Sequence, residues 1–260
     1  MESVLQGVLA SRDKYTDELT QYTELLRSRS DKSKLGVYAM QRGIGEKFVE
    51  SFGIFYIGRA TEMLLPRYLD KLEDFGLISK ANNRPIFNER YIMPIYDVDG
   101  RVLNLVGYSK ESKERYIYGT AKYYMRRDTL YGLESLESAY SKGYAILTEG
   151  ITDCQRLRSL GYKNSFAMCG THRSEYIRQQ LSRCRYGVIE IPDRDIAGLK
   201  AKRSWKYSRS VTIYIKRGYK DIDEMLRTRE MCELFNEYMA IVIKELTSCT
   251  LPMEKETTII

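Results

Sequence analysis

The sequence has few of the residues that form structural zinc sites, and it lacks the long apolar runs of membrane-spanning proteins. Its 260 residues include a single histidine, His172, and five cysteines, no two of which are spaced like a zinc knuckle. We therefore expect no structural zinc. The cysteines look unpaired, which fits a reducing cytoplasm. The sequence shows neither a signal peptide nor an apolar run of membrane-spanning length, so a cytoplasmic location without a membrane partner is expected.

Tryptophan and phenylalanine are also scarce, with 1 and 7 residues against 22 tyrosines. Tyrosine can stack on nucleobases and also form hydrogen bonds. The chain carries 42 lysines and arginines against 35 acidic residues, which gives a net charge of +7 and a pI near 9.0. An excess of positive charge suits a polyanionic partner. The length is sufficient for one large or two small domains with a buried core.

Acidic residues gather in three short signatures, each of which follows an apolar run. Carboxylates at the carboxyl ends of neighbouring parallel strands are where an open α/β sheet builds a site. Such a cluster suits Mg²⁺ or Mn²⁺, and it is self-repelling unless a cation sits within it. The signatures are Glu149 and Asp153 in YAILTEGITD, Asp193 and Asp195 in YGVIEIPDRDIAG, and Asp221 and Asp223 in YKDIDE.

The chain alternates strand and helix patterns between residues 144 and 215, which predicts a mainly parallel sheet. Upstream and downstream, other periodicities apply. The expected helices are at 3–27, within 36–76, and at 151–160, 173–183, 197–206 and 228–246. The expected strands are YAILT, NSFAM, GVIEI and VTIYI, with a hairpin over 91–107 that turns at 97–100 and a polar linker at 27–34.

The three acidic signatures together resemble the TOPRIM domain, which DnaG-type primases share with topoisomerases, OLD-type nucleases and RecR-like repair proteins. Other segments resemble the primases in particular. The resemblance covers about residues 35–225, and these segments are YAMQRGIGEKFVESFG at 38–53, RYIMPIYDVDGRVLNLVG at 90–107, LYGL at 130–133 and NSFAMCGT at 164–171.

This resemblance implies an α/β fold in which a Rossmann-like, mainly parallel TOPRIM sheet follows a mixed α+β subdomain and precedes a C-terminal helix. The implied domains are an N-terminal helix and linker at 1–34, a primase-core subdomain at 35–140, the TOPRIM domain at 141–225, and a helical segment with a tail at 226–260.

The resemblance also implies a DNA-directed RNA polymerase that makes short RNA primers on single-stranded DNA from ribonucleoside triphosphates, with two or more Mg²⁺ or Mn²⁺ ions. A replicative helicase or a separate recognition protein is the expected partner. The zinc-binding and helicase-binding domains of cellular primases have no counterpart in these 260 residues. This compact form favours a phage-encoded protein in the cytoplasm of an infected bacterial cell.

By resemblance, Glu149, Asp193 and Asp195 are catalytic, and they hold metal together with Asp221 and Asp223. Glu149 could alternatively act as a base. Asp153 has three possible roles, as a metal ligand, as a partner of a ligand, or as the cap of a helix. Gly170 and Thr171 could place a backbone amide at a phosphate before the next helix, or they could form a simple structural turn.

Basic residues should contact the template and the nucleotide. We call residues 115–127 the basic track, because cations alternate there with tyrosines, as in single-strand binding surfaces. The Gly-Gly-Arg of the family reads Val106-Gly107-Tyr108 here, so one expected arginine is missing. The proposed DNA or nucleotide contacts are Arg42, Arg115, Lys122, Arg126 and Arg127.

Other functions share parts of this pattern. A TOPRIM nuclease uses the same metal chemistry but leaves the resemblance at 35–133 unexplained. A type IA topoisomerase needs a large additional domain with a nucleophilic tyrosine. A non-catalytic DNA-binding or helicase-loading module has no need of six carboxylates. The helix at 3–27 could dock a partner or fold back onto the core.

Overall fold

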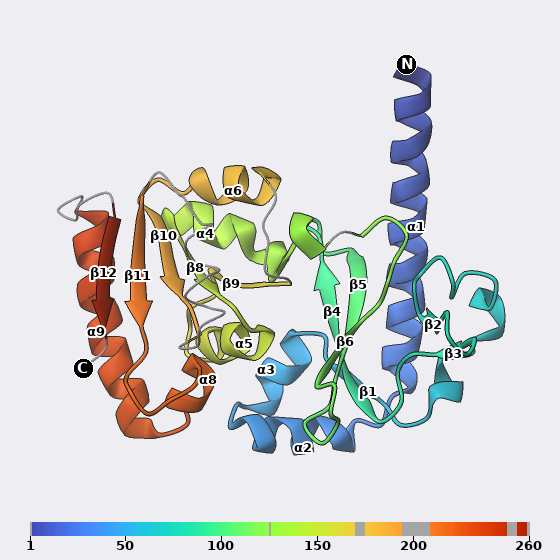
Figure 1. The fold of residues 1–260 in the computed structure, drawn as a ribbon, viewed down its shortest axis with the longest axis horizontal. Coiled ribbons are helices and arrows are strands. Elements are labelled where there is room, and N and C mark those ends of the chain that lie inside the picture. Colours follow the sequence, from blue (N-terminus) through green and yellow to red (C-terminus); the bar gives the residue numbers. More distant parts are fainter. Residues whose placement is uncertain (1, 125, 170–174, 194–208, 249–253, 259–260) are drawn as a thin grey trace. The chain divides into compact units, whose positions relative to one another are not determined.

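The computed structural model describes residues 2–124, 126–169, 175–193, 209–248 and 254–258. The chain divides into two compact units, unit 1 at Met1–Met125 and unit 2 at Arg126–Ile260 (Figure 1). The domain limits expected from the resemblance put this boundary after residue 140, and they stay a prediction. Helices surround a largely parallel sheet in unit 2, so the mixed α/β fold class is confirmed.

Unit 1 is built around a four-stranded antiparallel sheet, whose strand order is β1-β4-β5-β6. A two-stranded sheet of β2 and β3 accompanies it. The elements are α1 (Glu2–Arg29), α2 (Ser33–Arg42), α3 (Glu46–Ser51), β1 (Phe55–Ile57), η1 (Ala60–Met63), η2 (Pro66–Tyr68), β2 (Ile78–Ser79), β3 (Arg84–Pro85), β4 (Arg90–Tyr96), β5 (Val102–Tyr108) and β6 (Tyr116–Tyr118).

The predicted hairpin is confirmed as β4 and β5, which pair antiparallel. Local chemistry fixes its turn, since Oδ1 of Asp97 accepts hydrogen bonds from the amides of Asp99 (2.9 Å) and Arg101 (2.8 Å). Gly100 has a φ of 78°, a conformation that favours glycine. The sequence prediction missed β1 and β6, which are three residues each and carry too little periodicity to read.

Helix α1 is part of the hydrophobic core of unit 1. Its residues Tyr15, Leu19, Tyr22 and Leu26 are at most 6% exposed and belong to the same buried cluster as β1, β4 and β5. The hydroxyl of Tyr22 also donates to the carbonyl of Met63 (2.9 Å). The helix therefore folds back onto its own unit, and the idea that this apolar face docks a partner is wrong.

The predicted polar linker is also shorter than expected. Helix α1 continues to Arg29 and α2 begins at Ser33, so only three residues of the expected stretch at 27–34 separate the helices. The side chain of Asp31 accepts hydrogen bonds from both the amide and the hydroxyl of Ser33 (2.9 and 2.7 Å), which supports the bend between the two helices.

Unit 2 holds a six-stranded sheet of order β12-β11-β10-β8-β9-β7, in which only β7 runs antiparallel to its neighbour. The elements are η3 (Arg126–Asp128), β7 (Leu130–Tyr131), η4 (Leu133–Ser135), α4 (Leu136–Lys142), β8 (Tyr144–Thr148), α5 (Ile151–Ser159), β9 (Ser165–Met168), α6 (Glu175–Ser182), β10 (Gly187–Ile191), β11 (Ser210–Tyr214), α8 (Ile222–Met225), α9 (Arg229–Thr247) and β12 (Glu254–Thr258).

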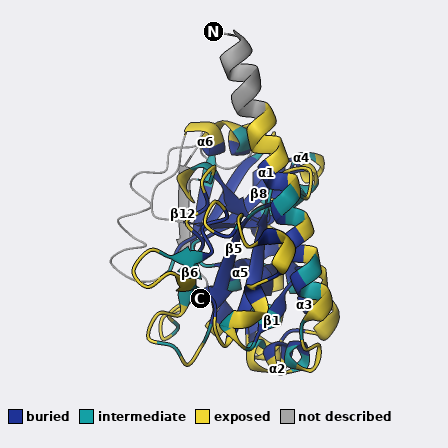
Figure 2. Cartoon of the chain, turned by 90° about the vertical axis from the view of Figure 1, so that its right-hand side faces the viewer, coloured by how far each residue is buried: buried dark blue, intermediate teal, exposed yellow. Residues whose placement is uncertain are grey.

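Both faces of this sheet are buried. Alternate strand residues point to opposite sides, and helices cover each side. On β8, Ile146 packs with α5, α8 and α9, whereas Ala145 and Leu147 pack with α4 and α6. Strands β5 and β8 are coloured as buried in Figure 2. A sheet with helices on both faces presents its strand ends as the accessible edge, which is where loops can build a site.

Several described elements of unit 2 were not predicted, namely the strands β7 and β12, the helices α4 and α8, and the 3-10 helices η3 and η4. The helix predicted at 197–206 lies outside the described residues. The predicted strands β8, β9, β10 and β11 and the helices α5, α6 and α9 are confirmed within a residue or two. Among the described residues, no helix is long and apolar enough to cross a membrane.

Candidate functional site

The first two acidic signatures leave the sheet at the same edge. Strands β8 and β10 are parallel neighbours, and Thr148 at the end of β8 is paired with Ile191 at the end of β10. Glu149 follows Thr148 directly, and Asp193 comes two residues after Ile191. Both carboxylates therefore begin at adjacent strand ends, as the sequence predicted, and both residues are half-buried.

The turn after β8 is tightly fixed. The buried hydroxyl of Thr148 lies 3.1 Å from the carbonyl oxygens of both Gly150 and Phe166, which ties the turn to strand β9. Gly150 caps α5 with an extended backbone, and the carboxylate of Asp153 lies directly over it. A Cβ atom on Gly150 would stand 2.3 Å from Oδ2 of Asp153, so this close approach requires glycine.

Gly150→Ala should therefore disturb Asp153. We expect a loss of stability of about 1–3 kcal/mol, because the added methyl must displace a buried carboxylate. Gly45→Ala is the matched control, since Gly45 also caps a helix with an extended backbone but its Cβ would meet Phe48 at an ordinary 3.5 Å. Urea unfolding should separate the two variants, and an equal, small loss from both would contradict the packing of Asp153 over Gly150.

Asp153 is only 3% exposed and lies among other carboxylates. Burial, followed by the negative charges of Asp193 and Asp221, raises the pKa of Asp153 well above its usual value. The amide of Asp223 donates to Oδ1 of Asp153 (2.9 Å) and lowers the pKa of Asp153, which offsets part of this effect. This hydrogen bond joins α5 to α8. The three roles left open for Asp153 stay open.

The third signature forms a short helix that the sequence did not predict. Oδ1 of Asp221 caps α8 by accepting the amide of Glu224 (2.8 Å). Asp223, 2% exposed, meets two arginines: Nε of Arg156 lies 3.2 Å from its Oδ1, and a terminal nitrogen of Arg227 lies 2.9 Å from its Oδ2. The Arg227 contact has readable i,i+4 spacing, whereas Arg156 is 67 residues away.

The cluster has the donor chemistry and the charge of a divalent-metal site, because its side chains are oxygen ligands of one sign held close enough to repel. Among the described residues, however, no three His, Cys, Asp or Glu side chains form a group that could hold a metal ion. The predicted residues Asp195, Gly170 and Thr171 lie outside the described residues. The metal set stays a prediction.

The predicted DNA contacts belong to both units. Arg42, Arg115 and Lys122 lie in unit 1, and Arg126 and Arg127 lie in the 3-10 helix η3 of unit 2. All except the half-buried Arg42 are exposed. Lys122 lies 3.3 Å from Oδ1 of Asp74, an exposed pair that adds little stability.

Tyr108, which stands where the resemblance predicts an arginine, lies in a row of tyrosines that the sequence did not reveal. Tyr56, Tyr91, Tyr108 and Tyr116 are register partners across β1, β4, β5 and β6. The guanidinium of Arg42 lies 5.8 Å from the ring centre of Tyr108, a cation–π distance. The cation absent at position 108 is thus present above the ring, supplied by helix α2.

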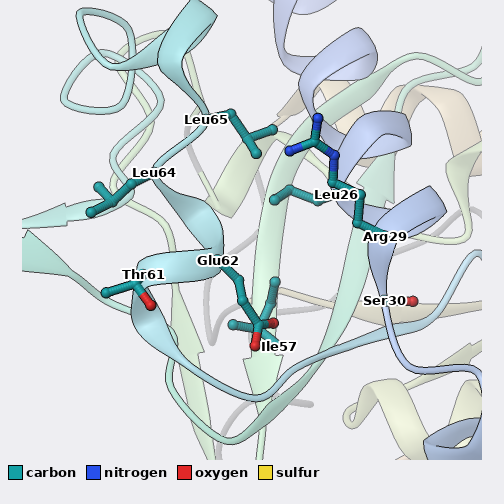
Figure 3. A pocket seen from close by; sticks show the side chains of 8 residues that line it. All are labelled: Leu26, Arg29, Ser30, Ile57, Thr61, Glu62, Leu64 and Leu65. Atoms are coloured by element: carbon teal, nitrogen blue, oxygen red, sulfur yellow. The ribbon is translucent and has the colours of Figure 1, made fainter.

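Hollows are present among the described residues of unit 1. The first, about 230 Å³, is lined mainly by leucines and by Arg29 and Glu62 (Figure 3). Glu62 is already engaged there, since its carboxylate accepts the amides of Gly58 and Arg59 (3.1 and 3.0 Å). The second, about 400 Å³, is lined partly by basic-track residues Ile117, Tyr118 and Thr120. Of these two hollows in the described part of the unit, the second borders a predicted functional segment.

Known proteins are similar to this chain in sequence and in fold. Residues 21–137 match the family model described as the DNA primase catalytic core, N-terminal domain. The DNA primase of Aquifex aeolicus is 30% identical over 226 residues, which is 79% of this chain and 44% of that protein. A DnaG primase catalytic domain, solved bound to single-stranded DNA, superposes with a TM-score of 0.74 at 21% identity, covering 89% of this chain and 80% of that one.

The chain has the fold of a DnaG-type primase catalytic core. The crystal structure of the Aquifex aeolicus primase, comprising its zinc-binding and RNA polymerase domains, agrees with a TM-score of 0.71 at 24% identity. The superposition covers 90% of this chain and 61% of the Aquifex aeolicus chain. The chain thus spans less than half the length of the Aquifex aeolicus primase that it matches in sequence.

Proposed function

We propose that this protein is a DNA primase, a nucleotidyltransferase that synthesises short RNA primers on single-stranded DNA. The observation that carries the proposal is the meeting of acidic strand ends, from β8 and β10, in a chain with the fold of the DnaG catalytic core. We further propose that residues 141–225 are a TOPRIM domain.

Glu149, Asp193 and Asp195 are the proposed core of the metal site, with Asp221 and Asp223 at its margin. Bound Mg²⁺ or Mn²⁺ ions would offset the negative charge that develops on the phosphoryl oxygens and leaving pyrophosphate. The turn of Thr148 and Gly150 holds Glu149 at the strand end. In support, burial and then the neighbouring carboxylates of Asp193 and Asp221 raise the pKa of Asp153, so the cluster carries charge that a cation would neutralise.

The basic track is the proposed template surface, together with Arg42. Its exposed cations suit phosphates, and its tyrosines, which are half-buried or, for Tyr123, exposed, suit stacking on bases. The hollow of about 400 Å³ beside Tyr118 adds an apolar recess bordered by Lys80, Ser79 and Thr120, which matches the mixed character of a nucleobase. Gly170 and Thr171 remain proposed as a phosphate turn.

Arg126→Ala combined with Arg127→Ala should weaken binding to single-stranded DNA and flatten its salt dependence. Each lost phosphate contact lowers the slope of log affinity against log salt by about 0.7 on a single strand. Fluorescence anisotropy at several salt concentrations measures that slope. The control replaces Arg178 of α6 and Arg183, which follows that helix; both are also exposed, and their replacement removes the same charge. Equal slopes for both double variants would place the DNA elsewhere.

One reaction distinguishes polymerase from nuclease. The protein is incubated with single-stranded DNA, four ribonucleotides and Mn²⁺ or Mg²⁺, with label on the nucleotide in one tube and on the DNA in another. We expect short labelled RNA and intact DNA. Cut DNA without RNA would favour the TOPRIM nuclease, and bound but unchanged DNA would favour a non-catalytic module.

A replicative helicase or a recognition protein remains the proposed partner for efficient priming. Because α1 is packed into unit 1, its apolar face at Tyr15 to Leu26 is not the docking element. The phage-type origin stays a prediction, as does the cytoplasmic location.

A further inference from the structure

Helix α5 carries two buried arginines that serve different parts of unit 2. Arg158, 8% exposed, lies 2.7 Å from Oε1 of Glu134 and also donates to the carbonyl oxygens of Gly132 and Ser165 (2.8 and 3.0 Å). It ties α5 to the strand β9 and to the chain before α4, away from the acidic edge. Arg156, 4% exposed, instead meets the third acidic signature.

Both carboxylate oxygens and the backbone amide of Asp223 have partners. Its Oδ1 lies 3.2 Å from Nε of Arg156, its Oδ2 lies 2.9 Å from Arg227, and its amide donates to Asp153 (2.9 Å). Arg227 is half-exposed, whereas the Arg156 and Asp223 side chains are 4% and 3% exposed. Burial makes Arg156 the partner on which Asp223 chiefly depends.

Both oxygens of Asp223 are thus directed to guanidinium groups. A carboxylate that ligates a cation must turn at least one oxygen toward that cation. Turning Oδ1 would leave Arg156 buried without this partner oxygen, and turning Oδ2 would break the contact with Arg227. An uncompensated buried charge is costly, so the ion pair resists this exchange. The pair also joins α8, which has only four residues, to α5, which bears Asp153.

We propose that Arg156 is a positioning residue of the acidic edge, which engages Asp223 as its counter-ion, so that Asp223 anchors α8 to α5 and does not ligate the metal. Asp153 is then set in place through the amide of Asp223, and Asp221 through the helix that it caps. This inference rests on the proposed function only in that it assigns the residues of the same metal site.

A cycle of variants tests the proposal: Arg156→Met, Asp223→Met and both together. Each single change breaks the buried ion pair and should lower the Tm of the metal-free protein by roughly 5–10 °C. The double variant replaces the pair by two apolar side chains and should regain most of that loss, because an apolar pair can substitute for a buried ion pair.

Mn²⁺ affinity, measured from the electron paramagnetic resonance signal of free Mn²⁺, is the second readout. Displacement of α8 and Asp153 should weaken binding about tenfold in either single variant, the size of effect seen for groups that support metal ligands. The double variant should return close to the affinity of the unaltered protein, because no ligand has been removed. Arg158→Met is the control, and it should lower Tm without changing Mn²⁺ affinity.

The outcomes separate the roles. Recovery of both Tm and Mn²⁺ affinity in the double variant supports the anchor. Recovery of Tm with persistently weak Mn²⁺ binding means that Asp223 is a ligand and overturns the proposal, as does the absence of coupling in Tm. If the unaltered protein binds no Mn²⁺, the metal site of the proposed function fails and this assignment fails with it; that result is distinct, because it appears before any residue is changed.

Discussion

Glu149→Gln should abolish primer synthesis while the protein remains folded. Glu149 leaves the sheet directly after β8, beside the strand end that leads to Asp193, so its charge belongs to the proposed metal site. The substitution keeps the size of the side chain and removes only the charge. Loss of one preorganised electrostatic group of this kind lowers the rate by about 10²- to 10³-fold.

The measurement is the initial rate of labelled ribonucleotide incorporation, with circular dichroism to verify the fold. Glu137→Gln is the control, because it makes the same chemical change on an exposed residue of α4. It should retain nearly full activity. A folded Glu149→Gln protein that makes primers at a normal rate would remove Glu149 from the site.

Leu19→Ala should destabilise unit 1 strongly. Leu19 is fully buried between α1 and the antiparallel sheet, so truncation leaves a cavity in the core. Such changes cost about 2–5 kcal/mol. Urea unfolding followed by circular dichroism should show the transition moving to lower urea concentration. Leu25→Ala makes the same change at a partly buried position of the same helix and should cost much less.

This comparison also decides what a truncation would mean. Deletion of residues 1–30 removes Tyr15, Leu19, Tyr22 and Leu26 from the core, so we expect it to unfold unit 1. Loss of priming after that deletion would then report on stability and not on a partner. If Leu19→Ala and Leu25→Ala are equally mild, α1 does not belong to the core and a docking role regains support.

Local patterns carried the successful predictions of fold. The hairpin of β4 and β5 was readable because Asp97 and Gly100 form their turn within the segment itself. The strands β8 and β10 were readable because strands buried on both faces are mostly apolar. Strand β12 was missed because its residues, EKETT, are polar, and only its register with β11 defines it.

The sequence predicted where two of the acidic residues leave the sheet, but it did not predict the contacts between elements. Glu149 and Asp193 follow apolar strands, and adjacency of those strands brought them to one edge. Nothing in the sequence pairs Arg156 with Asp223, because that contact depends on α5 and α8 packing together. Likewise, the position of Arg42 over Tyr108 required the register of the sheet and the placement of α2.

The central claim is that the protein copies a DNA template into RNA. The most direct measurement is to sequence the products made on two single-stranded templates that differ in one internal block, in the presence of four ribonucleotides and Mn²⁺. The account predicts short, alkali-sensitive products whose sequences are complementary to each template and change with the block. Products that ignore the template, or cleaved templates without any RNA, would contradict it.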